Sequence, residues 1–299
     1  MQDGALLLVG VGGLGCRWAS HAHLNVEEDC DLLLVDSDSS SLDLSSSAST
    51  VRLGSESSEG AILPELGHDW AKAHASVFAE MFDRAELVLI AAGLGGGVGS
   101  GASTWLAEQA RASGALVVTV VGLPFEDQVA RMRWARLSRP RLEAASHATI
   151  GISLSALALR AEKRGAEWES GGGWVPSLIR ALVQTQARKG VINLDLMDLR
   201  TVLTQAGRST VLVAQGDCYD PQRLFQKAFD APLERIDLVN AATCLLHIEG
   251  GDQVTLGDFD RIADAFTRGL SDNCHVIYGA SIVRELEGEV RVIAVLAGL

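Results

Sequence analysis

The sequence predicts an α/β fold in which a doubly wound, parallel-sheet domain is joined by a long helix to a smaller α/β domain. Three observations predict it. Short apolar runs, typical of buried parallel strands, alternate with segments of helical periodicity. Two of these runs end directly in glycine-rich loops, as strands of ligand-binding α/β domains do. A continuous helical segment at residues 174–189 separates two groups of runs.

The first group of elements extends from residue 5 to residue 152. The apolar runs predict five buried strands and one short strand-like segment, at residues 5–10, 32–35, 87–91, 116–121 and 148–152, with the short segment at 50–53. Helical patterns lie at residues 70–82, 102–112 and 129–145. Residues 37–60 are rich in serine and predict mostly loop. This order is typical of a doubly wound domain.

The second group of elements follows a polar, glycine-rich segment at residues 160–173. After the long helix, further apolar runs predict strands at residues 211–214, 243–249, 275–279 and 290–296, and helical patterns lie at 221–229 and 256–270. We therefore expect a first domain over residues 1–173, a central helix over residues 174–190 and a second α/β domain over residues 191–299.

The charge and cysteine content narrow the function. The chain has 299 residues and a net charge of −13, which argues against nucleic acid as a partner, because that binding depends on Lys and Arg. A phosphate ligand would need backbone N–H groups, helix N-termini and a metal ion. Five widely spaced cysteines predict neither a zinc site nor disulfides and fit a reducing cytoplasm. No signal peptide is recognisable, and no apolar run reaches the roughly 18–20 residues of a membrane-spanning helix.

A first glycine motif follows the first apolar run. Gly10, Gly12 and Gly15 satisfy G-x-G-x-x-G, and Asp36 follows at about the 20-residue spacing of a dinucleotide fingerprint. The pattern predicts a phosphate at the N-terminus of the next helix. It also occurs in dinucleotide-binding oxidoreductases, and the stretch VGVGGLGC resembles adenylating enzymes of the ubiquitin-activating type. Tight strand–helix packing is the structural alternative, so this motif alone leaves the nucleotide open.

A second glycine motif follows the strand predicted at residues 87–91. Residues 91–101 read AAGLGGGVGSG and lead into a helix. Glycines at this density let consecutive N–H groups point at one anion, and the helix dipole adds partial positive charge. An oxidoreductase has no use for a second phosphate loop here. A flexible linker is the alternative, but strand and helix patterns flank the loop closely.

An acidic motif, residues 193–198 with the sequence NLDLMD, follows the long helix. Seen alone, it is a common polar loop in which Asn193 or Asp195 caps the next helix.

Taken together, these motifs resemble the tubulin/FtsZ family. Residues 95–101 are similar to its signature GGGTGTG, with Val98 and Ser100 at the threonine positions, and residues 193–198 match its N-x-D-x-x-D loop. Similar segments at residues 35–38, 64–67, 230–233, 248–252, 277–280 and 290–292 extend the likeness over nearly the whole chain. The chain resembles FtsZ more than tubulin and is identified as a divergent bacterial FtsZ-like protein. The implied fold has a Rossmann-like GTPase domain, a central helix and a smaller domain that begins with the catalytic loop.

The resemblance implies GTP or GDP with Mg²⁺ as the ligand. The nucleotide-binding residues that it implies are Gly12, Gly13, Leu14, Arg17, Asp36, Gly95, Gly96, Gly97, Val98, Gly99, Ser100, Pro124, Asp127, Arg131, Ser153 and Trp174. For the ribose, alignment on Arg131 selects Asp127, whereas alignment on Pro124 selects Gln128. The catalytic residues that the resemblance implies are Asn193, Asp195 and Asp198, which would enter the pocket of the next subunit and orient the water that attacks the γ-phosphate. This role is chemically reasonable, because phosphoryl transfer needs mostly positioning and electrostatics. One Asp can cap the next helix while the other acts.

Several positions depart from the family pattern. Cys16 and Arg17 replace a Gly-Asn pair, and Asp36 replaces an Asn. Ser153 stands where the family reads guanine with an Asn. At the start of the central helix, Trp174 could stack on the base or belong to the core. These departures leave the base specificity open.

The implied function is a cytoskeletal GTPase that polymerises head to tail and hydrolyses GTP between subunits, in cell division or membrane remodelling. The altered base-reading positions leave a second hypothesis open, a nucleotide-binding filament or scaffold with little or no turnover. The arginine-rich segment at residues 131–141 is either a contact for an anionic membrane or a neighbouring filament, or a solvated helix face. We expect a cytoplasmic protein, located at the inner face of the cell membrane under the first of these interpretations, directly or through a membrane adaptor.

Overall fold

The computed structural model contains two compact units, Met1–Arg180 and Ala181–Leu299. Their division falls within helix α8 (Trp174–Ala187), the helix that the sequence predicts between the two domains. The structure describes residues 5–24, 26, 30–55, 63–163, 165, 167–170, 174–187, 191–192, 196–205, 207–229, 233–234, 241–284 and 286–299.

The first unit is built on a parallel sheet. Its strands are β1 (Ala5–Val11), β2 (Cys30–Asp36), β3 (Ser49–Arg52), β4 (Ala85–Gly93), β5 (Leu116–Leu123) and β6 (Ala148–Ser153). They lie in the order β3-β2-β1-β4-β5-β6, and every pairing among them is parallel. Most strand residues are buried on both faces, which explains why the strands read as continuous apolar runs.

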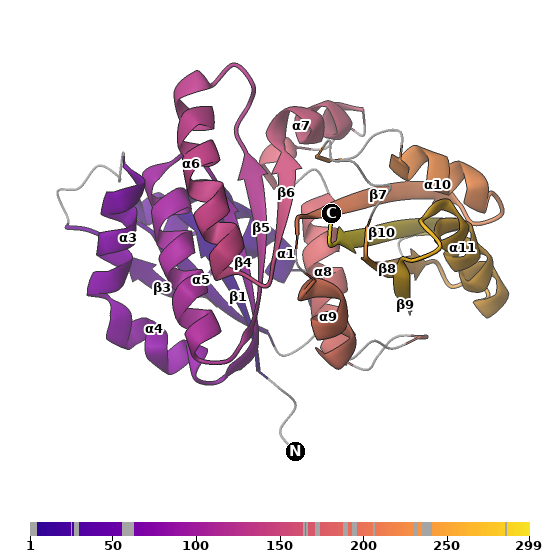
Figure 1. Ribbon diagram of the computed structural model, residues 1–299, viewed down its shortest axis with the longest axis horizontal. Coiled ribbons are helices and arrows are strands. Elements are labelled where there is room, and N and C mark those ends of the chain that lie inside the picture. The colour runs from indigo at the N-terminus through magenta and orange to yellow at the C-terminus, as the bar shows by residue number, and fades with distance from the viewer. Residues whose placement is uncertain are drawn as a thin grey trace. The chain divides into compact units, whose positions relative to one another are not determined.

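Helices cover both faces of this sheet (Figure 1). They are α1 (Gly12–His23), α2 (Ser39–Leu42), α3 (Pro64–Ala73), α4 (Ala75–Phe82), α5 (Ser103–Ala112), α6 (Val129–Ala145) and α7 (Leu154–Glu162), with a π-helical turn η1 (Val98–Ala102) before α5 and a 3₁₀ turn η2 (Trp168–Ser170). The connection from β1 to β2 runs toward one edge of the sheet, whereas the connections from β4 to β5 and from β5 to β6 run toward the other edge. Because crossovers between parallel strands are right-handed, the two directions place their helices on opposite faces.

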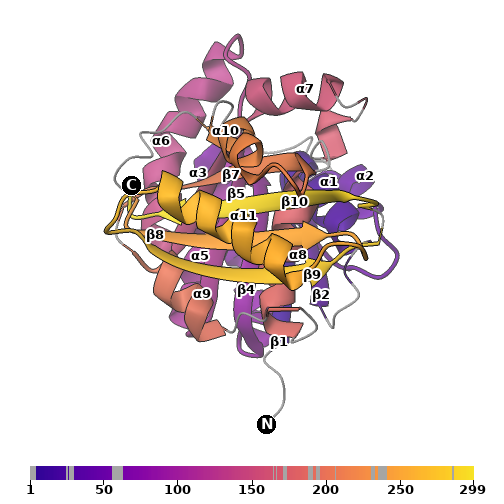
Figure 2. The ribbon, with the colours of Figure 1, turned by 90° about the vertical axis from the view of Figure 1, so that its right-hand side faces the viewer.

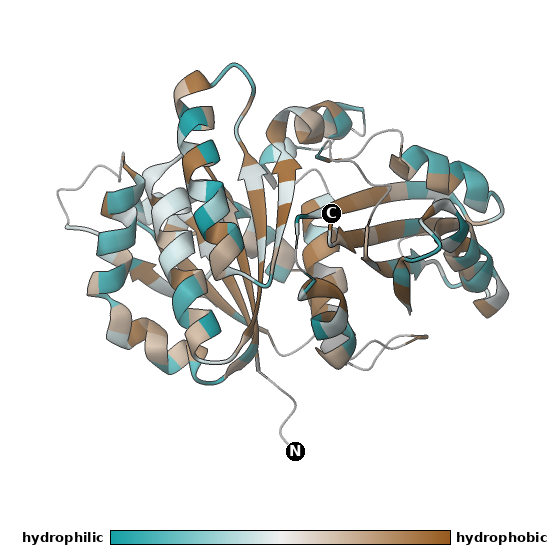
Figure 3. Cartoon of the chain, in the orientation of Figure 1, coloured by the Kyte–Doolittle hydropathy of each residue, from teal (hydrophilic) through white to brown (hydrophobic). Residues whose placement is uncertain are grey.

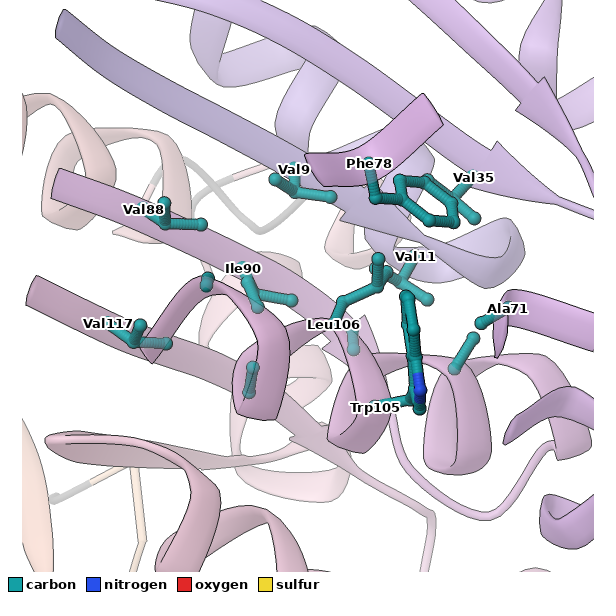
Figure 4. Close-up of a cluster of buried hydrophobic side chains, with 14 of the residues drawn as sticks. Val9, Val11, Val35, Ala71, Phe78, Val88, Ile90, Trp105, Leu106 and Val117 are labelled. Atoms are coloured by element: carbon teal, nitrogen blue, oxygen red, sulfur yellow. The ribbon is translucent and has the colours of Figure 1, made fainter. Parts of the chain in front are cut away.

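A dense core fills the face beneath α3 to α6. Val11 and Val35 of the sheet face Phe78 of α4 and Trp105 of α5, with Leu106 beside them (Figure 4). The ring centroids of Phe78 and Trp105 are 5.8 Å apart. Fully burying side chains of this size contributes about 1.5–3 kcal/mol each, so this cluster anchors the helices against the strands whose ends form the site.

The structure has two helices where the sequence predicts one. The sequence predicts a single helix over residues 70–82, whereas the structure has α3 ending at Ala73 and α4 beginning at Ala75. At the break, the Nδ1 atom of His74 lies 2.9 Å from the backbone oxygen of Trp70. The side chain therefore occupies the oxygen that the helical N–H of residue 74 would otherwise use. No proline or glycine marks this position, so the sequence pattern does not reveal it.

The second unit contains a mixed sheet. Its strands are β7 (Ser209–Asp217), β8 (Thr243–Gly250), β9 (His275–Ile282) and β10 (Glu289–Ala297), in the order β7-β10-β8-β9. β10 is antiparallel to β7 and β8, whereas β8 and β9 are parallel. Helices α10 (Pro221–Phe229) and α11 (Leu256–Gly269) pack on one face, and Figure 2 shows α11 crossing it. Helix α9 (Leu196–Leu203) also belongs to this unit.

Hydropathy follows this packing. The strands are mostly hydrophobic, while α10 and α11 contain many hydrophilic residues (Figure 3). Helix α11 begins with a capping box between Thr255 and Asp258, which satisfies N–H groups at its start. A buried ion pair joins Glu249 of β8 to Arg291 of β10 at 2.8 Å, and the two residues face each other in the strand register. The sheet of this unit is thus fixed by both apolar and charged contacts.

Candidate functional site: a phosphate-binding cavity

A cavity of about 690 Å³ lies at the carboxyl ends of the strands of the first unit. The sheet order reverses between β1 and β4, because the chain moves from β1 to β2 on one side and later to β4 on the other. In open α/β sheets, ligands bind outside the carboxyl ends of the strands at such a switch point. The residues after β1 and β4, Gly12–Leu14 and Gly93–Gly99, supply much of the wall. Sheet topology alone therefore selects this place for a ligand.

Two helix N-termini meet at this cavity. Helix α1 begins at Gly12, directly after β1, and the π-helical turn that leads into α5 begins at Val98. A hypothetical Cβ on Gly12 would lie 3.2 Å from the backbone nitrogen of Gly99, so the two glycine loops touch. The first N–H groups of a helix lack intrahelical partners, and each N-terminus carries about half a positive charge. The arrangement suits an anion with several oxygens.

Glycine is required at particular positions of both loops. Gly12 has φ +70° and Gly95 has φ +94°, a left-handed conformation that other residues adopt at a cost. A Cβ on Gly95 would also lie 2.7 Å from the backbone oxygen of Arg131. These constraints hold the loop close to the start of α6. Backbone geometry thus explains the glycines at positions 12 and 95.

Ser100 stabilises the second loop from inside. Its Oγ accepts a hydrogen bond of 2.8 Å from the backbone N–H of Gly95, and its side chain is buried. Nearby, the hydroxyl of Ser103 donates to the backbone oxygen of Gly99 at 2.6 Å. Ser100 lines a smaller neighbouring pocket between α3, α5 and α6 rather than the large cavity. The Ser100 hydroxyl therefore stabilises the second glycine loop, which lines the cavity.

Charged side chains of both signs stand on the cavity wall. Arg52 and Arg131 supply positive charge, and Asp36 and Asp38 supply negative charge. Burial raises the pKa of Asp36, opposed by hydrogen bonds from Ser41 and from backbone N–H groups. For Asp38, hydrogen bonds from Ser40 lower the pKa instead, as expected for the residue that caps α2. The two neighbouring carboxylates thus have opposite electrostatic environments.

Most of the expected nucleotide-binding residues are brought together. Those on the wall are Gly12, Gly13, Leu14, Asp36, Gly96, Gly97, Val98, Gly99, Pro124 and Arg131. Gly95 shapes the same loop through its left-handed backbone. Arg17 is exposed on α1, outside the wall formed by the described residues. Ten of the predicted residues therefore line one cavity.

The two candidate residues for the ribose lie differently. The expected acid, Asp127, is exposed and lies outside the described wall, whereas Gln128 lines the cavity. The reason is a turn in which the N–H of Gln128 donates to the backbone oxygen of Phe125 at 3.0 Å, directly before α6 begins at Val129. This turn directs residue 128 inward and residue 127 outward. The alignment on Pro124 predicts this arrangement, and the alignment on Arg131 does not.

The expected base contacts are placed elsewhere. The Ser153 hydroxyl caps α7 by accepting a bond of 3.3 Å from the N–H of Ala156, and its neighbour Leu154 lines the cavity instead. Trp174 is 5% exposed at the start of α8 and lies apart from the described wall. Trp168 packs edge-on against Phe125, with ring centroids 5.0 Å apart. Among the described residues, the positions of Ser153, Trp168 and Trp174 therefore favour helix capping and core packing over contact with a base.

The acidic motif is described in part. Asn193 and Asp195 lie outside the described residues. Asp198 lies in the first turn of α9 and is half-buried, a position where a carboxylate interacts favourably with the helix dipole. The described residues contain no group of three or more His, Cys, Asp or Glu side chains arranged to hold a metal ion. Within the same residues, no helix is long and apolar enough to cross a membrane.

Several wall residues escape sequence reasoning. Ser37, Asp38, Ser39 and Ser41 come from the serine-rich segment that predicts mostly loop, and Arg52 comes from the short strand-like segment at residues 50–53. The signal that could have found Arg52 is its place at the end of β3. Since parallel strands all end at the same edge of a sheet, a charged residue at the end of any of them reaches the ligand side.

Comparisons with known proteins show the family of the chain. Residues 5–159 match the family model described as Tubulin/FtsZ family, GTPase domain, and residues 210–299 match FtsZ family, C-terminal domain. Cell division protein FtsZ 2 of Methanocaldococcus jannaschii is 26% identical over 306 residues, covering 99% of this chain and 80% of that protein. Cell division protein FtsZ 1 of Pyrococcus furiosus is 28% identical over 301 residues, covering 98% and 81%.

Solved structures show the same fold. An FtsZ dimer of M. jannaschii superposes with a TM-score of 0.89 at 24% identity, covering 99% of this chain and 88% of that one. A protofilament of CetZ2 from Haloferax volcanii has a TM-score of 0.78 at 19% identity, covering 98% and 93%. The first family model spans residues 5–159, which is 155 of 299 residues and more than half of the chain. The chain therefore belongs to the tubulin/FtsZ family and has its two-domain fold.

Proposed function

We propose that this protein is an FtsZ-like cytoskeletal GTPase that binds GTP in the cavity of its first unit and assembles head to tail into filaments, in cell division. The convergence of two glycine-rich helix N-termini on one cavity at the sheet's switch point carries this proposal. The names of the relatives support the biological process, because those aligned over most of their length are cell division proteins.

The residues of the cavity fit a nucleotide polyphosphate. The N–H groups at the start of α1 and around Val98 would bind phosphate oxygens, and Arg131 would add a charged donor. Mg²⁺ usually keeps several waters and uses one or two carboxylates together with substrate phosphates. A cavity with two wall carboxylates, Asp36 and Asp38, meets that requirement without a protein-only metal cluster. Mg²⁺ therefore belongs to the proposal as a companion of the phosphates.

Hydrolysis would require a second subunit. Asn193, Asp195 and Asp198 of one copy would enter the cavity of the next and orient the attacking water. Such a contact joins two different surfaces of the subunit. It gives an open filament unless the rotation that relates neighbouring subunits closes the assembly into a ring. Phosphoryl transfer depends mainly on positioning and charge stabilisation, so a shared site is chemically sufficient.

The first test is the concentration dependence of turnover. GTP hydrolysis per molecule should be near zero in dilute, unassembled protein and should rise when sedimentation detects polymer. Full specific activity in the dilute sample would contradict the shared site. Assembly without turnover at any concentration would instead favour a nucleotide-binding scaffold.

A substitution in the acidic motif gives a second test. Asp198→Ala should abolish turnover while GTP binding persists, because Asp198 acts on the neighbour's nucleotide. Asp83→Ala is a matched control, since Asp83 is an exposed carboxylate next to α4 in the first unit. Equal turnover in both variants would show that Asp198 takes no part in hydrolysis.

A membrane or membrane adaptor is the remaining proposed partner. Arg133 and Arg136 are exposed on α6, whereas Arg139 is paired with Glu143 at 2.6 Å. An exposed basic pair on an acidic protein can attract an anionic surface. Cosedimentation with anionic vesicles, compared with neutral vesicles and with the variant in which both arginines are replaced by Gln, tests this contact.

A further inference from the structure

The cavity has two chemically different sides. On the side of β2 and β3 the wall is polar or charged, with Asp36, Ser37, Asp38, Ser39, Ser41 and Arg52. On the side of β5 and β6 it contains apolar Pro124 and Leu154 together with Gln128 and Arg131. The two helix N-termini lie between these sides, after β1 and β4. A ligand that spans the switch point would therefore have partly apolar surroundings on the β5–β6 side and only polar or charged surroundings on the β2–β3 side.

This difference between the two sides orients a nucleotide. Its base has large apolar faces and needs apolar contacts, which the β5–β6 side offers through Pro124 and Leu154. Its phosphates belong at the helix N-termini in the middle. The end of the phosphate chain then points toward the β2–β3 side. The position that distinguishes a triphosphate from a diphosphate would lie among the polar residues there.

Arg52 is well placed for that position. It is the last residue of β3 and lies opposite Asp36 in the parallel register with β2. Its Nε donates a hydrogen bond of 3.4 Å to the backbone oxygen of Ser37, which orients the guanidinium along the wall. A guanidinium has five N–H donors, so the Nη groups carry four more that match phosphate oxygens in pairs.

Charge supports the same assignment. Among the described wall residues, Arg52 is the one cation on the β2–β3 side, where Asp36 and Asp38 are both acidic. A terminal phosphate brought next to two carboxylates would be repelled unless a cation stood there as well. Arg52 supplies positive charge there in addition to the proposed Mg²⁺, and it adds to the hydrogen bonds from Ser40 in lowering the pKa of Asp38.

We propose that Arg52 binds the terminal phosphate of a nucleoside triphosphate and so sets the preference of the cavity for triphosphate over diphosphate. The inference rests on the proposed nucleotide-binding function and adds a residue that discriminates between the two ligand states. Because Arg52 is exposed at the end of a short strand, its substitution should leave the fold intact.

The test is a comparison of dissociation constants. Binding of GDP and of a slowly hydrolysed GTP analogue, with Mg²⁺ and below the assembly concentration, is measured by calorimetry for wild type, Arg52→Gln and Arg52→Lys. Loss of a charge-assisted, two-pronged contact should weaken triphosphate binding by about tenfold with little change for GDP. Arg52→Lys keeps the positive charge but loses the paired N–H donors of the guanidinium. Its dissociation constant for the triphosphate should lie between those of wild type and Arg52→Gln. Arg84→Gln is the matched control, because Arg84 is exposed and lies away from the described wall.

Each other outcome has a distinct meaning. Equal weakening of GDP and GTP binding in Arg52→Gln would place Arg52 on an inner phosphate and overturn the assignment. No weakening, or the same weakening in Arg84→Gln, would show that Arg52 makes no specific contact. If wild type binds neither nucleotide, the proposed function itself fails, and this result is separate from any effect of Arg52.

Discussion

At the scale of one residue, the buried carboxylate of Asp36 lowers the stability of the folded state. The residue is 5% exposed, and its carboxylate accepts a 2.8 Å hydrogen bond from the N–H of Ser37. Burial still raises its pKa above 3.8, so the folded protein holds this negative charge less readily than the unfolded chain does. A charge retained at such a position is typical of functional sites.

The sign of the pH effect follows from that shift. The folded state binds a proton at Asp36 more tightly, so the contribution of Asp36 to stability should fall as the pH rises from 3.8 through its raised folded pKa. Asp36→Asn should therefore increase the free energy of unfolding at pH 7, measured by denaturant titration without nucleotide, and the gain should shrink toward pH 4.

Asp38 provides the control with the opposite sign. Its pKa is lowered by the hydrogen bonds from Ser40, so its stabilising contribution is present above the unfolded pKa and is lost as the pH falls. Asp38→Asn should give no gain at pH 7. A gain of similar size in both variants would point to the overall charge of −13 rather than to the burial of Asp36.

At the scale of an element, the second glycine loop and its π-helical turn form one preorganised unit. Gly95 is left-handed, its N–H is bound by Ser100, and the turn continues into α5 through the Ser103 hydroxyl. Helix α3 also approaches closely, since a Cβ on Gly67 would lie 2.3 Å from the backbone oxygen of Gly97. The loop is therefore fixed by contacts on several sides before any ligand binds.

Two neighbouring glycines test this interpretation. Gly95→Ala should destabilise the protein by at least about 1–2 kcal/mol, the cost of a left-handed residue with a Cβ, and more because the Cβ meets the backbone of Arg131. Gly96→Ala is the matched control, because a Cβ there meets nothing within 4 Å. Thermal unfolding without nucleotide measures both. Equal stabilities would show that the loop relaxes freely around residue 95.

At the scale of the whole molecule, net charge opposes self-assembly. Each copy carries −13, and like charges on stacked subunits repel each other over the Debye length, which is about 30 Å at 0.01 M salt and about 10 Å at 0.1 M. Filament formation must overcome this repulsion through short-range contacts and bound cations.

Ionic strength should therefore favour assembly. At constant Mg²⁺ and saturating GTP, the critical concentration, measured by sedimentation, should fall as monovalent salt rises from about 0.01 M to about 0.1 M, because screening shortens the repulsion. A critical concentration that rises over this range would mean that complementary charges across the subunit contact outweigh the net repulsion.

Much of the fold could be read from the sequence because it depends on local patterns. The strands buried on both faces read as apolar runs, and helix α6 has the bounds expected from its periodicity. The break at His74 could not be read, because it depends on one side-chain contact with Trp70. Helix α2 has four residues, too few to show a period.

The sequence by itself determined the family, the α/β class and the two glycine loops, since each is encoded by residues close together in the chain. The tertiary structure alone decided which side chains share the cavity. Among the described residues, it placed Gln128 on the wall and Asp127 outside it, bound the Ser100 and Ser153 hydroxyls to backbone N–H groups, and added Arg52 to the wall. The physical reason is that a wall is assembled from the ends of strands that are distant in sequence, and the direction of each side chain there depends on turns and caps that a linear pattern does not specify.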